Sequence, residues 1–392
     1  MAKKKSKDMP KMDIDELKAY LNKEVKSVKV EIATERYENE GDVEPLATGN
    51  PWLDLITGIG GFPKGKIVEI SGEEGVSKSA LTQTIAGVIQ YGGVIRPFRG
   101  DHDYDEMIEE SGNVVFVDAE RAIDLRIPTQ RKHLAERLGV DIDRLLIAQP
   151  DTIEQGLDIV KACVASGNVS LVVYDSIVAS ATEDEFDKDN QEGSWNKLPQ
   201  AINRGFRNLA PELSRTDCCL VVLNQLRQNM NKKNKFDKEW VTTGGKGLKH
   251  WCSLRIELTK AGKIKDTNGL EVGHRVRARI IKTRLDINHG DAYLYFYHDS
   301  GYNYGEELFE LALEWEIIVS PSSGWYSFDI EEIDEKYDGK IRRSDMIDFL
   351  NEDEDLYNKV LEAVYYYFDE YNKGTALEDD LGEVDEDEED DE

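Results

Sequence analysis

A lysine and a serine that follow a glycine-containing turn are the first residues of this chain with an evident chemical use. The stretch Ser71–Ala80 reads SGEEGVSKSA and lies between a short apolar run, Lys66–Ile70, and a helical pattern that begins at Lys78. A strand, a loop and then Lys-Ser is the layout of a phosphate-binding loop. The usual pattern has a second glycine where this chain has Ser77. The stretch alone therefore leaves three interpretations open: a working nucleotide site, a degraded one, or a coincidence.

Polar or acidic side chains stand at the ends of four successive apolar runs that read as strands. The first run leads into the loop, and the others end in Asp118-Ala119-Glu120, Asp175-Ser176 and Asn224-Gln225. Ligands of a doubly wound parallel sheet bind outside the carboxyl ends of its strands, so these residues predict one site. The plainer interpretation is that polar residues merely mark the ends of strands. It poorly explains why polar residues end all of these strands next to a loop with a phosphate-binding pattern.

These side chains suit the hydrolysis of ATP with Mg²⁺. Lys78 is expected to reach the β- and γ-phosphates, while the Ser79 hydroxyl and Asp175 hold the Mg²⁺. Glu120 suits a base that orients or deprotonates the attacking water. Gln225 suits a sensor of the γ-phosphate, because an amide is a poor base but a good donor. The residues predicted to bind the nucleotide from the loop are Gly72, Glu73, Glu74, Gly75, Val76, Ser77, Lys78, Ser79 and Ala80.

The elements that must position these residues alternate along the chain. Short apolar runs separated by amphipathic helical patterns predict an α/β fold, with a mostly parallel sheet covered by helices on both faces. The predicted strands are Lys66–Ile70, Val114–Val117, Leu171–Tyr174 and Cys219–Leu223. Three later runs lack helices between them and predict antiparallel strands that extend the sheet. They are Ser253–Leu258, Val276–Lys282 and Ala292–His298.

Composition and charge narrow the class of protein. The 392 residues carry a formal net charge of −30, which argues against indiscriminate binding to a polyanion. No apolar stretch approaches the roughly 20 residues that span a bilayer, and no apolar segment follows the N-terminal lysines. We therefore expect neither a membrane segment nor a secretory signal. The four cysteines lack the C-x-x-C spacing of a zinc site and predict reduced thiols in a cytoplasmic protein.

The chain divides by composition into four parts. In order, we expect an N-terminal oligomerisation helix and strand, the main core, a small α+β C-terminal domain and a disordered acidic tail, at 1–45, 46–300, 301–373 and 374–392. The core carries a polar insertion at 94–111 and two long polar loops at about 181–198 and 227–246. The tail is either a solubility segment or a competitor for a nucleic-acid groove, and in the second case its deletion increases binding to duplex DNA.

From about residue 46 to 330 the chain resembles the bacterial RecA-type homologous recombinases. The stretches that carry the resemblance include ATGNPWLDLITGIGGFPKGKIVEI, FVDAERAID, VVYDSIVA, VLNQLRQ, TTGGKGLKHW and RARIIKTR. The resemblance implies a RecA-like P-loop ATPase core that forms a helical homo-oligomeric filament on single-stranded DNA. It implies pairing with homologous double-stranded DNA and strand exchange, with single-strand-binding and mediator proteins as further partners.

The resemblance also assigns residues outside the loop. It implies Lys282 and Arg284 as cations that reach the γ-phosphate of the neighbouring subunit, so that hydrolysis needs a filament, and it places Asp124 near the adenine. Exposed cations on an edge strand are the plainer interpretation of Lys282 and Arg284. The two long loops and their flanks match the family's DNA-binding segments. The residues implied there are Trp195, Arg204, Arg207, Arg227, Met230, Thr243, Gly244 and Gly245.

Within that set, two kinds of contact with DNA are expected. Trp195 would wedge between bases, and Met230 holds a similar place in the second loop, which suits sequence-independent binding of a single strand. The arginines and the glycine amides would hold phosphates.

Three residues depart from the family's pattern. Ser77 replaces the loop glycine, Ala80 stands where a second hydroxyl is usual, and His250 replaces an aromatic residue of the subunit interface. Two other functions therefore stay open: a non-hydrolysing or weakly hydrolysing regulatory filament protein, and a ring-forming ATPase or helicase. The insertions would suit a phage-encoded member, which we expect to act in the cytoplasm of a bacterial or phage-infected bacterial cell.

Overall fold

A computed structural model describes residues 12–182, 197–228, 240–242, 245–285, 290–330 and 333–380. The chain forms two compact units, Met1–Glu44 and Pro45–Glu392. Across the described residues, no helix combines the length and the hydrophobicity needed to cross a membrane.

The N-terminal unit contains the helices α1 (Ile14–Glu24) and α2 (Ala33–Glu40). A capping box begins α1, because Asp13 and Glu16 each accept a hydrogen bond from the other's backbone N–H group. The strand expected after this helix is not formed: residues 25–32 lead directly into α2. The side-chain amide of Asn22 instead binds the backbone N–H and C=O groups of Val30, at 2.7 and 2.8 Å, so these groups are satisfied without a partner strand.

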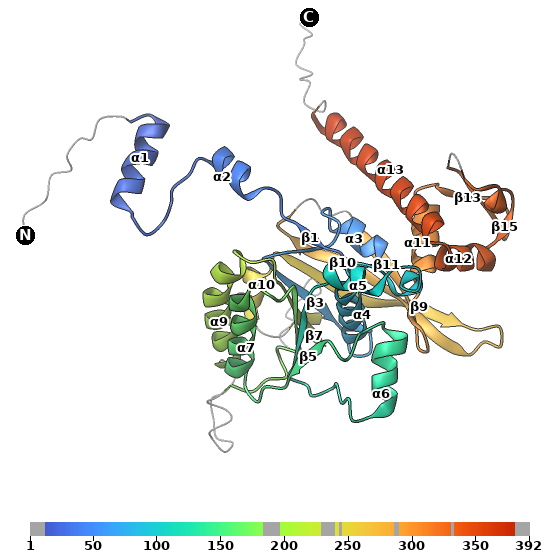
Figure 1. Ribbon diagram of the computed structural model, residues 1–392, viewed down its shortest axis with the longest axis horizontal. Helices are drawn as coiled ribbons and strands as arrows, with labels where there is room; N and C mark the ends of the chain where they lie inside the picture. The colour runs from blue at the N-terminus through green and yellow to red at the C-terminus, as the bar shows by residue number, and fades with distance from the viewer. Residues whose placement is uncertain are drawn as a thin grey trace, which may run out of the picture. The chain divides into compact units, whose positions relative to one another are not determined.

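The second unit is built on a ten-stranded sheet (Figure 1). Its order is β12-β11-β10-β9-β3-β7-β6-β4-β5, with β8 paired to β7. Neighbours are parallel from β9 to β5 and antiparallel from β9 to β12. The strands are β3 (Ile67–Gly72), β4 (Val114–Asp118), β5 (Leu145–Ala148), β6 (Leu171–Asp175), β7 (Cys219–Gln228), β8 (Trp240–Thr242), β9 (Leu254–Lys265), β10 (Glu271–Thr283), β11 (Asp291–Tyr297) and β12 (Gly301–Tyr302).

This topology confirms the predicted α/β fold with its mostly parallel sheet, and each strand predicted for the sheet is present. One detail differs, because the strand predicted from Ser253 joins the sheet parallel to β3, and the antiparallel part begins only with β10. The sequence pattern also missed β5. That strand lies at the edge of the sheet and leaves Leu146 60% exposed, so its short run LLIA lacks a full apolar pattern.

Helices cover both faces of the sheet, since alternate residues of each strand point to opposite sides. Val68 and Ile70 of β3 share one core with α4 (Lys78–Gln90). Residues of the opposite face, such as Val172 of β6, share a second core with α7 (Ile153–Ser166) and α9 (Lys197–Leu213). The short elements of this part are β1 (Pro45–Leu46), α3 (Pro51–Ile56), β2 (Phe62–Pro63), the 3-10 turn Arg96–Phe98, α5 (Tyr104–Glu109), α6 (Pro128–Lys132), the π-helical turn His133–Arg137 and α10 (Gly245–Trp251).

The segment after β12 adds helices and a three-stranded antiparallel sheet. Its elements are α11 (Tyr304–Glu314), β13 (Ile318–Ser322), β14 (Trp325–Phe328), the 3-10 turn Glu335–Tyr337, β15 (Ile341–Arg342), α12 (Arg343–Glu352) and α13 (Glu354–Asp380). Its hydrophobic core is continuous with that of the sheet, and the rings of Phe98 and Tyr357 meet across the two at 5.3 Å. The boundary predicted at residue 373 falls inside α13, where Ala376 and Leu377 are good helix formers. Residues 381–392 of the predicted tail lie outside the described residues.

Candidate functional site

The predicted phosphate-binding loop is the connection from β3 to α4. Gly72 ends β3 in a place without room for a side chain, since a Cβ atom there would lie 2.7 Å from the carbonyl oxygen of Leu258. Gly75 and Ser77 both have positive φ angles, 72° and 68°. The left-handed region costs a non-glycine residue about 1–2 kcal/mol, so Ser77 adopts the glycine-like conformation of the loop at an energetic cost. The helix that follows begins at Lys78, as a phosphate-binding loop requires.

Lys78 and Ser79, the first residues of α4, lie at the centre of the site. The Lys78 ammonium donates to the carbonyl oxygens of Gly72 (3.0 Å) and Glu73 (2.8 Å), and burial lowers its pKa. The Ser79 hydroxyl donates to Oδ2 of Asp175 at 2.6 Å, which joins the loop to the end of β6. Burial raises the pKa of Asp175 to about 6. A hydroxyl and a carboxylate are hard oxygen ligands of the kind that Mg²⁺ takes, so this pair fits the predicted metal site.

Glu120 follows β4 and is held against β6 and β7. Its Oε1 atom accepts from the Ser176 hydroxyl (2.5 Å) and from Nε2 of Gln225 (3.0 Å). The backbone supports this arrangement, because the N–H of Ala119 donates to the carbonyl oxygen of Asp175 at 2.8 Å. The structure therefore brings together the predicted base and the predicted sensor. Ser176 directly follows β6, and the sequence predicts no role for it.

A buried polar network that the sequence analysis missed lies beneath the site. Glu69 in the middle of β3 is fully buried, accepts from Nδ2 of Asn224 at 2.7 Å and pairs with Arg255 of β9. Asn224 immediately precedes Gln225, so the network fixes the strand that carries the sensor. A carboxylate between the apolar residues of the run IVEI, Ile67–Ile70, is the signal that points to Glu69.

Three predicted nucleotide-site residues lie outside this cluster of contacts. Asp124 is engaged by Arg126, whose guanidinium lowers the pKa of that carboxyl to about 2. Lys282 donates to the carbonyl oxygens of Lys249 and Cys252, each at 2.7 Å, and Arg284 donates to that of His250 at 2.9 Å. Both cations thus bind carbonyl groups at the C-terminal end of α10, where positive charge is favourable. Lys282 lies near the end of β10 and Arg284 directly follows that strand; here β10 pairs with β9 only, since its pairing with β11 ends at Arg279.

The predicted DNA-binding residues are only partly described. Trp195, Met230, Thr243 and Gly244 lie outside the described residues, and Gly245 begins α10. Arg207 on α9 and Arg227 on β7 are exposed.

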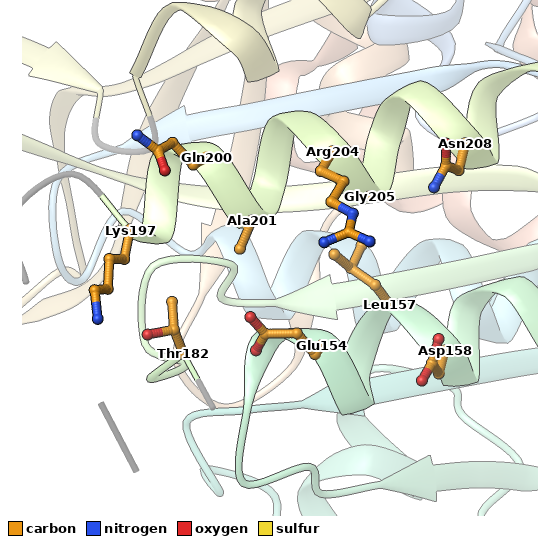
Figure 2. Close-up of a pocket in the computed structure, with 10 residues that line it drawn as sticks. All are labelled: Glu154, Leu157, Asp158, Thr182, Lys197, Gln200, Ala201, Arg204, Gly205 and Asn208. Atoms are coloured by element: carbon orange, nitrogen blue, oxygen red, sulfur yellow. The ribbon is translucent and has the colours of Figure 1, made fainter. Parts of the chain in front are cut away.

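Arg204, the remaining DNA-binding candidate, extends from α9 into a groove of about 640 Å³ beside α7 (Figure 2). Charges of both signs line this groove, since its lining includes Lys197 and Arg204 as well as Glu154 and Asp158. The groove is therefore not a uniformly basic surface.

The comparison with known families agrees with this geometry. The model of the RecA N-terminal domain family matches residues 17–303. The chain belongs to the RecA family. RecA of Paracoccus denitrificans is 33% identical over 292 residues, which cover 74% of each chain. RecA of Rickettsia canadensis is 31% identical over 287 residues, or 73% of this chain and 75% of its own. RecA of Phytoplasma mali is 30% identical over 328 residues, which cover 83% of this chain and 86% of that relative.

Membership of the RecA family gives the chain its broad function. It is a RecA-type recombinase, a class of ATP-binding proteins of DNA recombination and repair. The loop with Ser77 is thus the P-loop of a RecA-family core.

Proposed function

We propose that this protein forms a filament on single-stranded DNA, pairs that strand with a homologous duplex and promotes strand exchange, with ATP hydrolysis at subunit interfaces stimulated by DNA. The observation that carries the proposal is the 3.0 Å hydrogen bond from Gln225 to Glu120. It links the predicted base to β7, the strand that leads into the second predicted DNA loop. A change at the γ-phosphate can reach that loop through one strand.

In the proposed hydrolysis, different side chains would bind the metal, bind the phosphates and activate the water. Ser79 and Asp175 would hold Mg²⁺, the P-loop backbone and Lys78 would hold the phosphates, and Glu120 would orient or deprotonate water. Bound Mg²⁺ would supply charge neutralisation at the phosphates. Lys282 and Arg284 would act on the site of the neighbouring subunit, which makes the filament a condition of fast hydrolysis.

Two exposed cations support the DNA side of the proposal. The exposed cations Arg207 and Arg227 flank the two predicted DNA loops, and cations that contact phosphates bind without regard to sequence. Asp124 would lie near the adenine, and the bases would meet Trp195 and Met230. We place this activity in the cytoplasm of a bacterial or phage-infected bacterial cell.

A strand-exchange assay tests the proposal. The full chain is incubated with ATP, Mg²⁺, a circular single strand and either a homologous or an unrelated linear duplex. Joint molecules are expected only with the homologous duplex, and Lys78→Ala should form none. A ring helicase would instead unwind a forked duplex without need of homology. A regulatory filament protein would coat the single strand but exchange nothing, and either result would refute the proposal.

A further inference from the structure

The P-loop residue that departs from the family pattern touches a histidine far along the chain. His274 lies on β10, 197 residues after Ser77, and its Nε2 atom is 3.0 Å from the Ser77 hydroxyl oxygen. His274 is only 5% exposed, and its ring packs beside those of Phe296 and His298, with centroids 5.4 and 5.8 Å away. Packing against these rings therefore holds the His274 imidazole in the orientation that places Nε2 next to the Ser77 hydroxyl.

A second hydrogen bond holds the backbone of the same serine. The buried Tyr302 hydroxyl donates to the carbonyl oxygen of Ser77 at 3.3 Å, and that oxygen also accepts from the N–H of Leu81 in the first turn of α4. The Tyr302 ring packs on Phe296, with centroids 5.2 Å apart. Residues of β10, β11 and β12 thus form one cluster against the point where the loop enters the helix.

The backbone conformation of Ser77 explains why the hydrogen bonds from His274 and Tyr302 stabilise the loop. Its φ and ψ angles of 68° and 26° lie in the left-handed region, which glycine enters without strain and serine does not. A serine before a helix ordinarily turns its hydroxyl onto the first free N–H groups of that helix. Here Ser77 makes no such side-chain cap bond. Its hydroxyl is held by His274 instead, so it does not compete with a phosphate for those N–H groups.

We infer that His274 is a positioning residue of the nucleotide site, which holds Ser77 in the backbone conformation that glycine supplies in the usual P-loop. Tyr302 assists at the Ser77 carbonyl. The inference rests on the proposed binding of ATP by this loop. Its specific consequence is that His274 matters for ATP binding only while residue 77 is a serine.

A double-mutant cycle tests this dependence. The full chain, Ser77→Gly, His274→Ala and the double variant are titrated with a fluorescent ATP analogue and Mg²⁺. With Ser77 present, His274→Ala should weaken binding roughly fivefold, the effect of losing one buried hydrogen bond. With glycine at position 77, the same change should alter the affinity less than about twofold, since the cycle isolates the coupling between the two residues.

Matched variants separate positioning from stability. His102→Ala removes a histidine whose hydrogen bond goes to Glu354 (2.8 Å) and not to the loop, and should bind the analogue as the parent chain does. His274→Gln keeps a hydrogen-bonding group and should recover part of the lost affinity. Should His274→Ala fold poorly, His274→Leu fills the same buried volume without the hydrogen bond and replaces it in the cycle.

Two results would count against the inference in different ways. An equal loss of affinity from His274→Ala in the serine and glycine backgrounds would show a purely structural role and overturn the inference alone. Failure of the parent chain to bind the analogue above the level of Lys78→Ala would overturn the proposed nucleotide site, and the inference with it.

Discussion

The carboxylate of Glu120 is held by two hydrogen-bond donors, one directly after β6 and one in β7. Both the Ser176 hydroxyl (2.5 Å) and the Gln225 amide (3.0 Å) bind Oε1. Hydrogen bonds of this kind orient a carboxylate and lower the cost of preparing it for catalysis. Gln225 therefore acts twice in the proposed reaction: it senses the γ-phosphate and it positions the base.

Substitutions of these residues should affect turnover more than binding. Glu120→Gln keeps the shape of the side chain but removes the base, so kcat for ATP should fall by about 10²–10⁴ while ATP affinity stays near that of the parent. Gln225→Ala should lower kcat less, because Ser176 still holds the carboxylate, and should abolish the response to DNA. Steady-state kinetics with and without single-stranded DNA measure both effects. A Glu120→Gln variant with parental turnover would remove Glu120 from the mechanism.

At the scale of elements, α3 and α11 bury two carboxyl groups away from the nucleotide site. Asp54 on α3 is 5% exposed, and burial raises its pKa to about 7. Glu307 on α11 is fully buried, and its Oε2 atom has no hydrogen-bond partner among the described residues. Burial raises the pKa of this carboxyl well above its usual value. Both groups are thus more basic in the folded chain than in the unfolded one.

This arrangement predicts that stability falls as pH rises. An acid with a raised folded pKa stabilises the fold fully below its unfolded pKa, and this stabilisation is lost as the pH climbs toward the folded value. For Asp54 that window runs from 3.8 to about 7. Glu307→Gln and Asp54→Asn cannot ionise, so their unfolding free energies should improve relative to the parent as the pH is raised from 5 to 8. Urea unfolding across this range would contradict the prediction if the difference stayed constant.

At the scale of the whole molecule, the two cations at the end of β10, Lys282 and Arg284, have partners within their own subunit. Lys282 and Arg284 bind carbonyl groups at the end of α10, the helix that follows the second predicted DNA loop. The same two side chains are proposed to act on the neighbouring subunit's nucleotide. In the proposed filament they would therefore lie between the second predicted DNA loop and the nucleotide of the neighbouring subunit, where binding of DNA would change what they contact.

Mixing two inactive variants tests action between subunits. Lys282→Ala/Arg284→Ala subunits keep an intact P-loop, and Lys78→Ala subunits keep the cations. Each variant alone should hydrolyse ATP poorly, whereas a mixture on single-stranded DNA should recover activity at sites where one kind lies next to the other. Lys263→Ala, a surface cation of the neighbouring strand β9, serves as the control and should behave as the parent. No recovery in any ratio would place both cations in the site of their own subunit.

The parts of the fold and of the candidate site that are predictable from the sequence are those with a local sequence pattern. The strands and the residues at their ends follow from apolar runs and local polarity, and Ser79, Asp175, Glu120 and Gln225 meet as expected. Those contacts are predictable because each residue stands at the end of a strand or in the loop after one. His274 instead lies inside β10, so nothing in its local sequence predicts its bond to Ser77. The strand expected after α1 needs a pairing partner, which a sequence pattern does not supply.

The most direct test of the central claim is the rate of ATP hydrolysis by the full chain with and without single-stranded DNA. We predict that DNA stimulates hydrolysis, and that Lys78→Ala abolishes the activity in both conditions. Hydrolysis that is absent, or that proceeds at the same rate with and without DNA, would contradict the account.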